Sequence, residues 1–208
     1  MFLDDNSLVL ISGSTRSGKS FLLVKLLEFV FLNDRLSKGN GLIFTGTKFT
    51  DQFKDIQENN IYDNCDDYKN IINNFLKFIK SKKNKKSTRY YIIFDEMLGD
   101  IKLQSDVMKH LMCNYRHYKI SLFFLVQQFS SITSSILKQQ ITYAFIFPSN
   151  FTLRSIKGIY EAIGYGNFDT DKGFGNLIKN LTNGNKYTSL FYDSTVDEPN
   201  LRYQPFCA

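Results

Sequence analysis

Short apolar runs alternate along the chain with segments that have helical patterns. The apolar runs are predicted to be strands, and they comprise residues 7–12, 42–45, 90–94, 120–126, 141–147 and 187–192. Five further segments are predicted to be helices: residues 19–30, 68–79, 106–115, 153–163 and 174–181. Ser105 precedes the third of these helices and is expected to cap it. Strands that alternate with helices favour an α/β domain with a mainly parallel sheet.

The length and composition favour one globular domain. The chain has 208 residues, of which 43% are hydrophobic, so it can bury a core of ordinary size. We therefore predict a single domain over residues 1–208, in which the tail 194–208 has no assigned structure. The longest apolar stretch, residues 21–32, is interrupted by Lys25 and Glu28, so no membrane-spanning segment is expected.

The charge balance is basic, which suits a polyanionic partner such as a nucleic acid. The formal net charge is +6, although a soluble basic protein without such a partner is an open alternative. One run contains no acidic residue and either follows a phosphate backbone or is a solvated loop. Its cations are Lys77, Lys80, Lys82, Lys83, Lys85, Lys86 and Arg89. Arg154 and Lys157 are weaker candidates for the same role.

The cysteines and histidines do not indicate a metal site or a disulfide framework. The three cysteines are far apart and lack zinc-ligand or CxxC spacing: Cys65, Cys113 and Cys207. Their odd number and spacing fit a reducing compartment. The two histidines, His110 and His117, have no acidic or cysteine partner at the spacing of metal ligands.

A phosphate-binding loop follows the first predicted strand. The pattern GxxxxGK[ST] is matched without a gap by Gly13, Ser14, Thr15, Arg16, Ser17, Gly18, Lys19 and Ser20. The glycines allow backbone N–H groups to point at phosphate oxygens, and the helix that begins there adds its positive dipole. Lys19 is expected to reach the β- and γ-phosphates, and Ser20 to bind Mg²⁺. The loop therefore predicts a site for ATP with Mg²⁺.

An acidic pair ends the third predicted strand. Asp95 follows the apolar residues 90–94 and is expected to bind the metal through a water, and Glu96 is expected to activate the attacking water. Without the phosphate-binding loop, a solvated acidic pair would be the simpler interpretation.

Two other polar positions adjoin the fourth predicted strand. Gln127 directly ends its apolar run and is preferred over Gln128 as the group that senses the γ-phosphate or holds the water; a surface amide is the alternative. Arg116 precedes this strand, at the edge opposite the phosphates. Arg116 therefore either serves the site of a neighbouring subunit or is a solvated or helix-capping residue.

These residues resemble those of the FtsK–HerA lineage of P-loop NTPases, and most closely the poxvirus-type genome-packaging ATPases. The resemblance rests on the GSTRSGKS loop, the IIFDE strand end and the segment RHYKISLFFLVQQ, and it covers most of the chain. It implies a three-layer α/β sandwich of the additional-strand, catalytic-glutamate type. The same roles carry over to Lys19, Ser20, Asp95, Glu96 and Gln127, with Arg116 as the arginine finger.

The resemblance also implies a biological setting. Such proteins are ATP-driven motors that assemble as rings, here expected to be homo-oligomeric pentamers or hexamers, and push double-stranded DNA into a preformed capsid. The implied partners are DNA and proteins of the capsid or portal vertex, with no membrane. The implied location is the host-cell cytoplasm at sites of virus assembly, with retention in the virion as a further option.

The chain departs from the family pattern at two places, and other functions remain open. Poxvirus members often have a second Asp where this chain has Glu96, and an Arg-x-Asn-like element where it has residues 138–140. Another DNA-pumping ATPase of the lineage usually carries a membrane anchor or winged-helix tail, and neither is visible. A P-loop kinase usually has an arginine-rich lid, which is also not visible, and a nucleotide-gated scaffold would not need Glu96.

Overall fold

The strands form one mixed sheet in the computed structural model, which describes residues 3–32, 40–46, 53, 60–63, 66–82, 88–97, 101–129, 132, 134–148, 153–182 and 187–207. Within these residues the strands are β1 (Leu8–Ser12), β2 (Gly41–Thr45), β3 (Ile61–Tyr62), β4 (Tyr90–Asp95), β5 (Ile120–Val126), β6 (Tyr143–Ile146), β7 (Thr188–Asp193) and β8 (Tyr203–Cys207). Their order is β3-β2-β4-β5-β1-β6-β7-β8.

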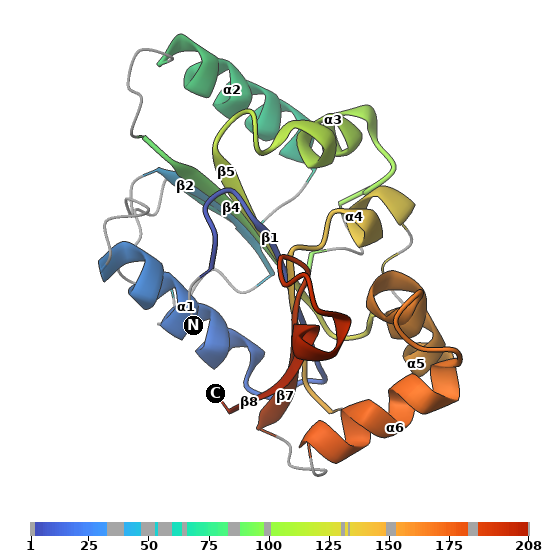
Figure 1. Ribbon diagram of the computed structural model, residues 1–208. Coiled ribbons are helices and arrows are strands. Elements are labelled where there is room, and N and C mark those ends of the chain that lie inside the picture. The colour runs from blue at the N-terminus through green and yellow to red at the C-terminus, as the bar shows by residue number, and fades with distance from the viewer. Residues whose placement is uncertain are drawn as a thin grey trace. The chain divides into compact units, whose positions relative to one another are not determined.

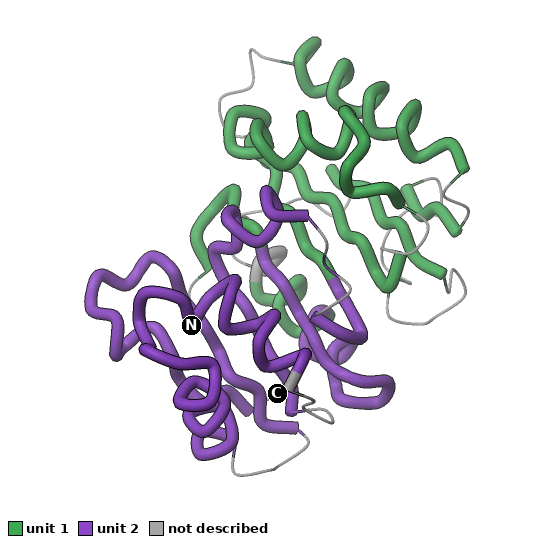
Figure 2. The backbone as a smooth tube through the Cα atoms, turned by 90° about the vertical axis from the view of Figure 1, so that its right-hand side faces the viewer, with its two compact units in different colours: residues 1–8, 24–124 green, residues 9–23, 125–208 purple. Residues whose placement is uncertain are grey.

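Helices connect most of these strands. They are α1 (Lys19–Leu32), α2 (Tyr68–Ser81), α3 (Asp106–Asn114), α4 (Ser135–Gln139), α5 (Leu153–Ile159), a π-helix (Tyr160–Gly164), α6 (Asp171–Thr182) and a 3₁₀-helix (Pro199–Arg202). The chain divides into two compact units, one of residues 1–8 and 24–124 and the other of residues 9–23 and 125–208 (Figure 2). The boundary falls inside β1, α1 and β5, so these three elements contribute to both units.

Unit 1 (residues 1–8 and 24–124) has a parallel sheet. β2 pairs in parallel with β3 and β4, and this register sets Thr45 beside Asp95. The N–H of Tyr90 donates to the carbonyl of Lys119 (2.9 Å), which places the starts of β4 and β5 together. Phe94 stacks on Phe124 with ring centres 4.7 Å apart, so β4 and β5 also run in parallel.

The helices of unit 1 cover this sheet with their apolar faces. α2 buries the side chains Tyr68, Ile72, Leu76 and Ile79, which recur at helical spacing. α2 and α3 pack against each other (Figure 1). Ser105 caps α3, because its hydroxyl accepts a hydrogen bond from the Met108 N–H (3.4 Å).

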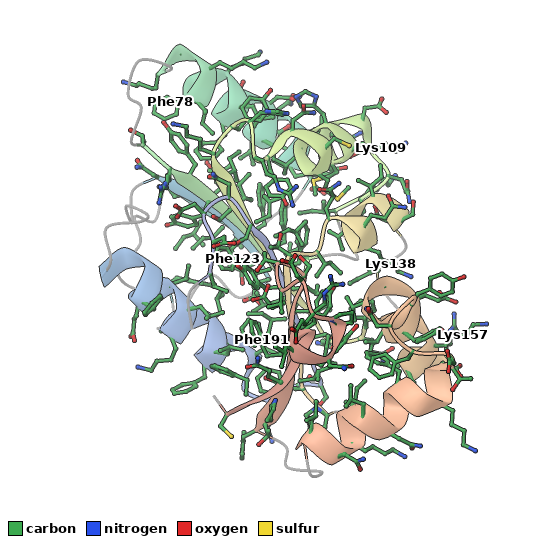
Figure 3. All side chains as sticks on the ribbon, in the orientation of Figure 1. Phe78, Lys109, Phe123, Lys138, Lys157 and Phe191 are labelled. Atoms are coloured by element: carbon green, nitrogen blue, oxygen red, sulfur yellow. The ribbon has the colours of Figure 1, made fainter. Side chains whose placement is uncertain are left out.

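Unit 2 (residues 9–23 and 125–208) combines parallel and antiparallel pairing. β1 runs parallel to β6, whereas β7 runs antiparallel to both β6 and β8. α5 and α6 pack together, and α6 also contacts β7 and β8. Phe191 of β7 lies among the buried side chains, and Lys157 extends outward from α5 (Figure 3).

A buried tyrosine ties the end of the chain to the π-helix. The Tyr203 hydroxyl donates to the carbonyl of Ile163 and accepts a hydrogen bond from the Asn167 amide (2.9 Å). Burial raises the pKa of Tyr203 to about 12, so the hydroxyl keeps the proton that it donates at neutral pH. The tail, which the sequence left unassigned, therefore contributes an ordered strand to unit 2.

The α/β class and the mainly parallel sheet are confirmed. β5 lies between β4 and β1, as expected for the additional-strand type. The sequence did not predict β3, α4 or β8, and the predicted helix over residues 153–163 is α-helical only to Ile159 before it becomes a π-helix. Cys65, Lys83, Lys85 and Lys86 lie outside the described residues. In the described part of the chain, no helix has the length and apolar character needed to cross a membrane.

Candidate nucleotide-binding site

The phosphate-binding loop joins the end of β1 to α1 in unit 2. It turns through a hydrogen bond from the Ser17 N–H to the Ser14 carbonyl (3.2 Å), and Arg16 and Gly18 adopt positive φ angles of 61° and 103°. The angle at Gly18 is one that side-chain-bearing residues rarely adopt. The helix begins directly afterwards, because the Leu22 N–H donates to the Gly18 carbonyl (2.9 Å). The N–H groups of the first helical turn are therefore presented at the loop.

Lys19 is held inside this loop. Its side chain is only 5% exposed, and Nζ donates to the carbonyls of Gly13 (2.8 Å) and Ser14 (3.1 Å). A buried ammonium group needs such partners, because transfer from water is otherwise costly. The loop thus holds a positive charge at a fixed position next to its own backbone, which is the arrangement required to bind a polyphosphate.

The loop has no room for a side chain at Gly13. A Cβ atom there would lie 2.6 Å from Ser17 Oγ and 2.8 Å from Phe147 Cβ. Ser17 is itself buried, and its hydroxyl has no hydrogen-bond partner in the part of the chain that the structure describes. Ser14, Thr15, Arg16 and Ser20 are exposed, so the outer surface of the loop is polar.

Gln127 follows the strand that contacts the loop. The Gly13 N–H donates to the carbonyl of Val126 (3.1 Å), the last residue of β5. Gln127 is the next residue along the chain, and both it and Gln128 are exposed. The structure therefore brings Gln127 to the start of the phosphate-binding loop within unit 2.

The acidic pair lies at the carboxyl edge of the sheet in unit 1. Asp95 is 6% exposed, and its Oδ2 accepts a hydrogen bond from Thr45 Oγ1 (3.3 Å). Glu96 is exposed and has a φ of 59°, which is uncommon for a residue with a long side chain. Strained backbone of this kind occurs preferentially at functional sites. The hydrogen bond thus helps to fix the position of Asp95, whereas Glu96 is exposed at a backbone bend.

Arg116 lies at the opposite edge of unit 1. It belongs to the turn between α3 and β5, close to the Lys119 carbonyl that pairs with the first residue of β4. Asp95 is the last residue of β4, so Arg116 and Asp95 lie at different ends of parallel strands. The exposed guanidinium group of Arg116 is stacked 5.2 Å from the ring centre of Tyr115. Arg116 therefore lies at the other end of β4 from the acidic pair.

Two residues that lie next to predicted site residues, one in each unit, were not singled out from the sequence. Thr45 ends a predicted strand, but its contact with Asp95 depends on the register between strands that are 50 positions apart. Phe147 also ends a predicted strand, and its ring borders the loop at Gly18. Among the described residues, no group of three His, Cys, Asp or Glu side chains could hold a metal by itself.

The chain matches a known protein family and is similar in fold to several solved structures. The family model described as "Poxvirus A32 protein" matches residues 2–152. The genome packaging NTPase B204 from Sulfolobus turreted icosahedral virus 2, solved with AMPPCP, has the same fold with a TM-score of 0.65. That alignment covers 99% of this chain and 98% of the other at 17% identity. A search of curated proteins found no match.

Two other solved structures have similar folds. B204, the DNA-packaging ATPase from Sulfolobus turreted icosahedral virus, aligns over 98% of both chains with a TM-score of 0.64 and 18% identity. The cytoplasmic domain of the type VII secretion ATPase EccC from Thermomonospora curvata has a TM-score of 0.64 at 11% identity. The alignment covers 100% of this chain but 24% of EccC. Two kinds of ATPase, one named for DNA packaging and one for secretion, therefore share this fold.

Proposed function

Because the chain belongs to the poxvirus A32 protein family, we propose that it is an ATPase that packages a viral genome by moving double-stranded DNA into a preformed capsid. The observation that carries this proposal is the GxxxxGKS loop with Lys19 buried against its carbonyls. The whole-length likeness to a packaging NTPase supports it at the level of the fold. Its partners would be DNA and proteins of the capsid or portal vertex, at sites of virus assembly in the host-cell cytoplasm or in the virion.

The phosphate-binding loop would hold ATP by its polyphosphate. The N–H groups of residues 13–20 would bind phosphate oxygens, and Lys19 would leave its carbonyl partners to contact the β- and γ-phosphates. The exposed Ser20 hydroxyl and the Asp95 carboxylate are oxygen ligands of the kind that Mg²⁺ prefers. When bound, Mg²⁺ would neutralise charge that develops on the phosphates. Thr45 would keep Asp95 oriented through its hydrogen bond.

Glu96 and Gln127 would act on the attacking water. The Glu96 carboxylate would accept a proton from the water as the water oxygen attacks the γ-phosphorus. The bond from this phosphorus to the β-phosphate oxygen would break, and ADP would be the leaving group. Gln127, one residue beyond the strand that contacts Gly13, would orient this water or sense the γ-phosphate. Both roles suit exposed side chains that follow the carboxyl ends of strands.

Arg116 would serve the site of an adjacent subunit in a ring of five or six copies. Its place at the amino edge of unit 1, away from Asp95, supports action in trans. Hydrolysis would then change the interface between subunits, and this change would move a DNA-gripping surface. The proposal therefore requires that the ATPase activity depends on assembly.

Arg116→Ala should abolish ATP turnover, and adding Lys19→Ala subunits should restore part of it. Neither variant is active alone, but in mixed rings an intact loop can meet an intact arginine. Random mixing gives this pairing at about one interface in four, so turnover should recover to roughly a quarter of the normal value. The measurement is steady-state ATP hydrolysis at increasing mixing ratios.

The matched control for this mixing experiment is Arg154→Ala, which removes another exposed arginine. Arg154→Ala should keep normal turnover both alone and in mixtures. Mixtures of Arg116→Ala and Lys19→Ala that never exceed the sum of their separate activities would contradict the role of Arg116 in trans.

The basic end of α2 is the surface that we assign to DNA. Lys77, Lys80 and Lys82 are exposed, and the described residues 74–82 include no acid. Lys80 Nζ lies 5.5 Å from the ring centre of Tyr118, which joins this surface to the turn before β5. Such cations can follow a phosphate backbone, and binding by them weakens steeply with salt.

Double-stranded DNA should stimulate ATP hydrolysis at low salt, and raised salt should remove the stimulation. Replacing Lys77, Lys80 and Lys82 by glutamine should weaken DNA binding and lower the slope of log affinity against log salt by about one per lost phosphate contact. Replacing Lys25, Lys172 and Lys179 by glutamine is the control, because these exposed lysines of α1 and α6 carry the same charge.

The outcome of this experiment separates the candidate functions. Salt-sensitive stimulation that depends on the α2 lysines would support a DNA translocase. Steady hydrolysis without any response to DNA, at concentrations high enough for ring assembly, would instead favour a P-loop kinase or a nucleotide-gated scaffold. Equal losses in both lysine variants would contradict the assignment of the DNA surface to α2.

A further inference from the structure

Tyr187 is brought to the phosphate-binding loop by the topology of unit 2. β1 and β6 are parallel, with Ser12 paired to Ile146, and β7 is antiparallel, with Leu190 paired to the same Ile146. β7 therefore enters the sheet at the edge where β1 and β6 leave it. Tyr187 precedes β7 and so lies at the edge from which the loop departs.

The ring of Tyr187 borders the loop at Gly18. A Cβ atom on Gly18 would lie 3.9 Å from Tyr187 Cδ1 and 3.6 Å from Phe147 Cε1. Phe147 is fully buried and forms part of the core. Tyr187, in contrast, is 57% exposed, and its ring lies beside the loop. Exposed large aromatic side chains that lie next to a candidate site commonly contribute to ligand binding.

A phosphate-binding loop recognises only part of a nucleotide. Its N–H groups and Lys19 contact phosphates, and none of these groups discriminates a nucleotide from inorganic polyphosphate. The base needs a separate contact within reach of the loop. A flat aromatic ring meets this need, because bases stack on aromatic side chains and every base has a π-face.

We propose that Tyr187 stacks against the base of the nucleotide whose phosphates bind residues 13–20. This inference rests on the proposed binding of ATP and adds the group that recognises the base. Stacking depends on ring area, so purine nucleotides are the class that this contact favours. Tyr187 is accordingly a positioning and specificity residue and takes no part in proton transfer.

The variant Tyr187→Trp gives a direct readout of base stacking, because the natural chain contains no Trp. In Tyr187→Trp the new indole is the single tryptophan, and its fluorescence should change when ATP stacks on it. Inorganic tripolyphosphate occupies the same loop without a base, so tripolyphosphate alone should leave the emission of the indole unaltered. Added to the ATP complex, it should displace ATP and reverse the change that ATP produced. An identical response to both compounds would overturn the proposal.

Affinities measured by calorimetry give the second readout. Tyr187→Ala should weaken binding of ATP and of GTP by about fivefold or more and leave the affinity for tripolyphosphate unchanged, whereas Tyr187→Phe should bind all three normally. Tyr165→Ala is the control, because it removes a tyrosine of the same unit that is 78% exposed. It should leave the affinities for ATP, GTP and tripolyphosphate unchanged.

The failures of the two proposals can be told apart. If the natural chain binds neither ATP nor tripolyphosphate, the proposed ATPase function fails and the role of Tyr187 fails with it. If ATP binds normally to Tyr187→Ala, or if tripolyphosphate binding weakens as much as ATP binding, only the stacking role is overturned. Retained tripolyphosphate binding also shows that the variant has folded.

Discussion

Replacing Glu96 by glutamine is expected to stop ATP turnover while ATP binding remains intact. Glutamine has nearly the same shape as glutamate but cannot accept a proton from the attacking water. General-base catalysis contributes about 10²- to 10⁴-fold, so turnover should fall by at least about 100-fold. Steady-state hydrolysis and equilibrium ATP binding, measured on the same preparation, check the two halves of this expectation. Hydrolysis within tenfold of the natural rate would remove Glu96 from its role.

The backbone of Glu96 provides a control for this experiment. Its φ of 59° strains any residue with a Cβ by about 1 kcal/mol or more, whereas glycine adopts this angle freely. Glu96→Gly should therefore lose turnover as Glu96→Gln does, but its free energy of unfolding should stay equal to or above that of the natural chain. At an ordinary φ the same change to glycine would lower that free energy. A clear loss of stability would show that the carboxylate also supports the fold.

Replacing Lys19 by alanine is expected to remove both ATP binding and turnover. Lys19 is a buried cation in the phosphate-binding loop, and nothing else in residues 13–20 except Arg16 carries a positive charge. Loss of one such electrostatic contact typically lowers the rate by about 10²- to 10³-fold. ATP binding measured by calorimetry and ATP hydrolysis should both fall, and a variant that keeps a tenth of normal turnover would contradict the site.

Lys25→Ala is the matched control for Lys19→Ala. Lys25 lies on the same helix, but it is exposed and its Nζ forms an ion pair with Glu28 at 2.9 Å. Surface pairs of this kind contribute little to stability, so Lys25→Ala should keep normal binding, turnover and folding. Lys19→Ala leaves the carbonyls of Gly13 and Ser14 without the ammonium group. The free energy of unfolding of Lys19→Ala should therefore fall by about 1 kcal/mol, and this variant should still fold.

The sequence predicted the elements whose patterns are strong. The apolar run over residues 120–126 became β5 with the same bounds, and Ser105 caps α3 as its position suggested. β8 was missed because its residues alternate weakly and include Pro205, which cannot donate to a sheet. β3 has two described residues, and α4 has five, which is too short for either pattern to be recognised.

In the candidate site, too, the sequence predicted features that depend on neighbouring residues and missed those that depend on distant ones. The phosphate-binding loop is a contiguous pattern, so its eight residues can be identified without a structure. The positive φ of Glu96 opposes the usual preference of glutamate, and no sequence rule predicts it. The hydrogen bond between Thr45 and Asp95 and the position of the Tyr187 ring beside Gly18 depend on how distant strands are aligned, which the sequence does not specify.

The two outer strands of the sheet have features that disfavour pairing with other chains. β3 is very short, and β8 carries a proline at a position that pairs with Leu190 on its inner side. Short edges and edge prolines are features by which proteins avoid open-ended aggregation through strand addition. Any association between copies of this chain should therefore use side chains on their surfaces, which allows a closed assembly to form without extending the sheet.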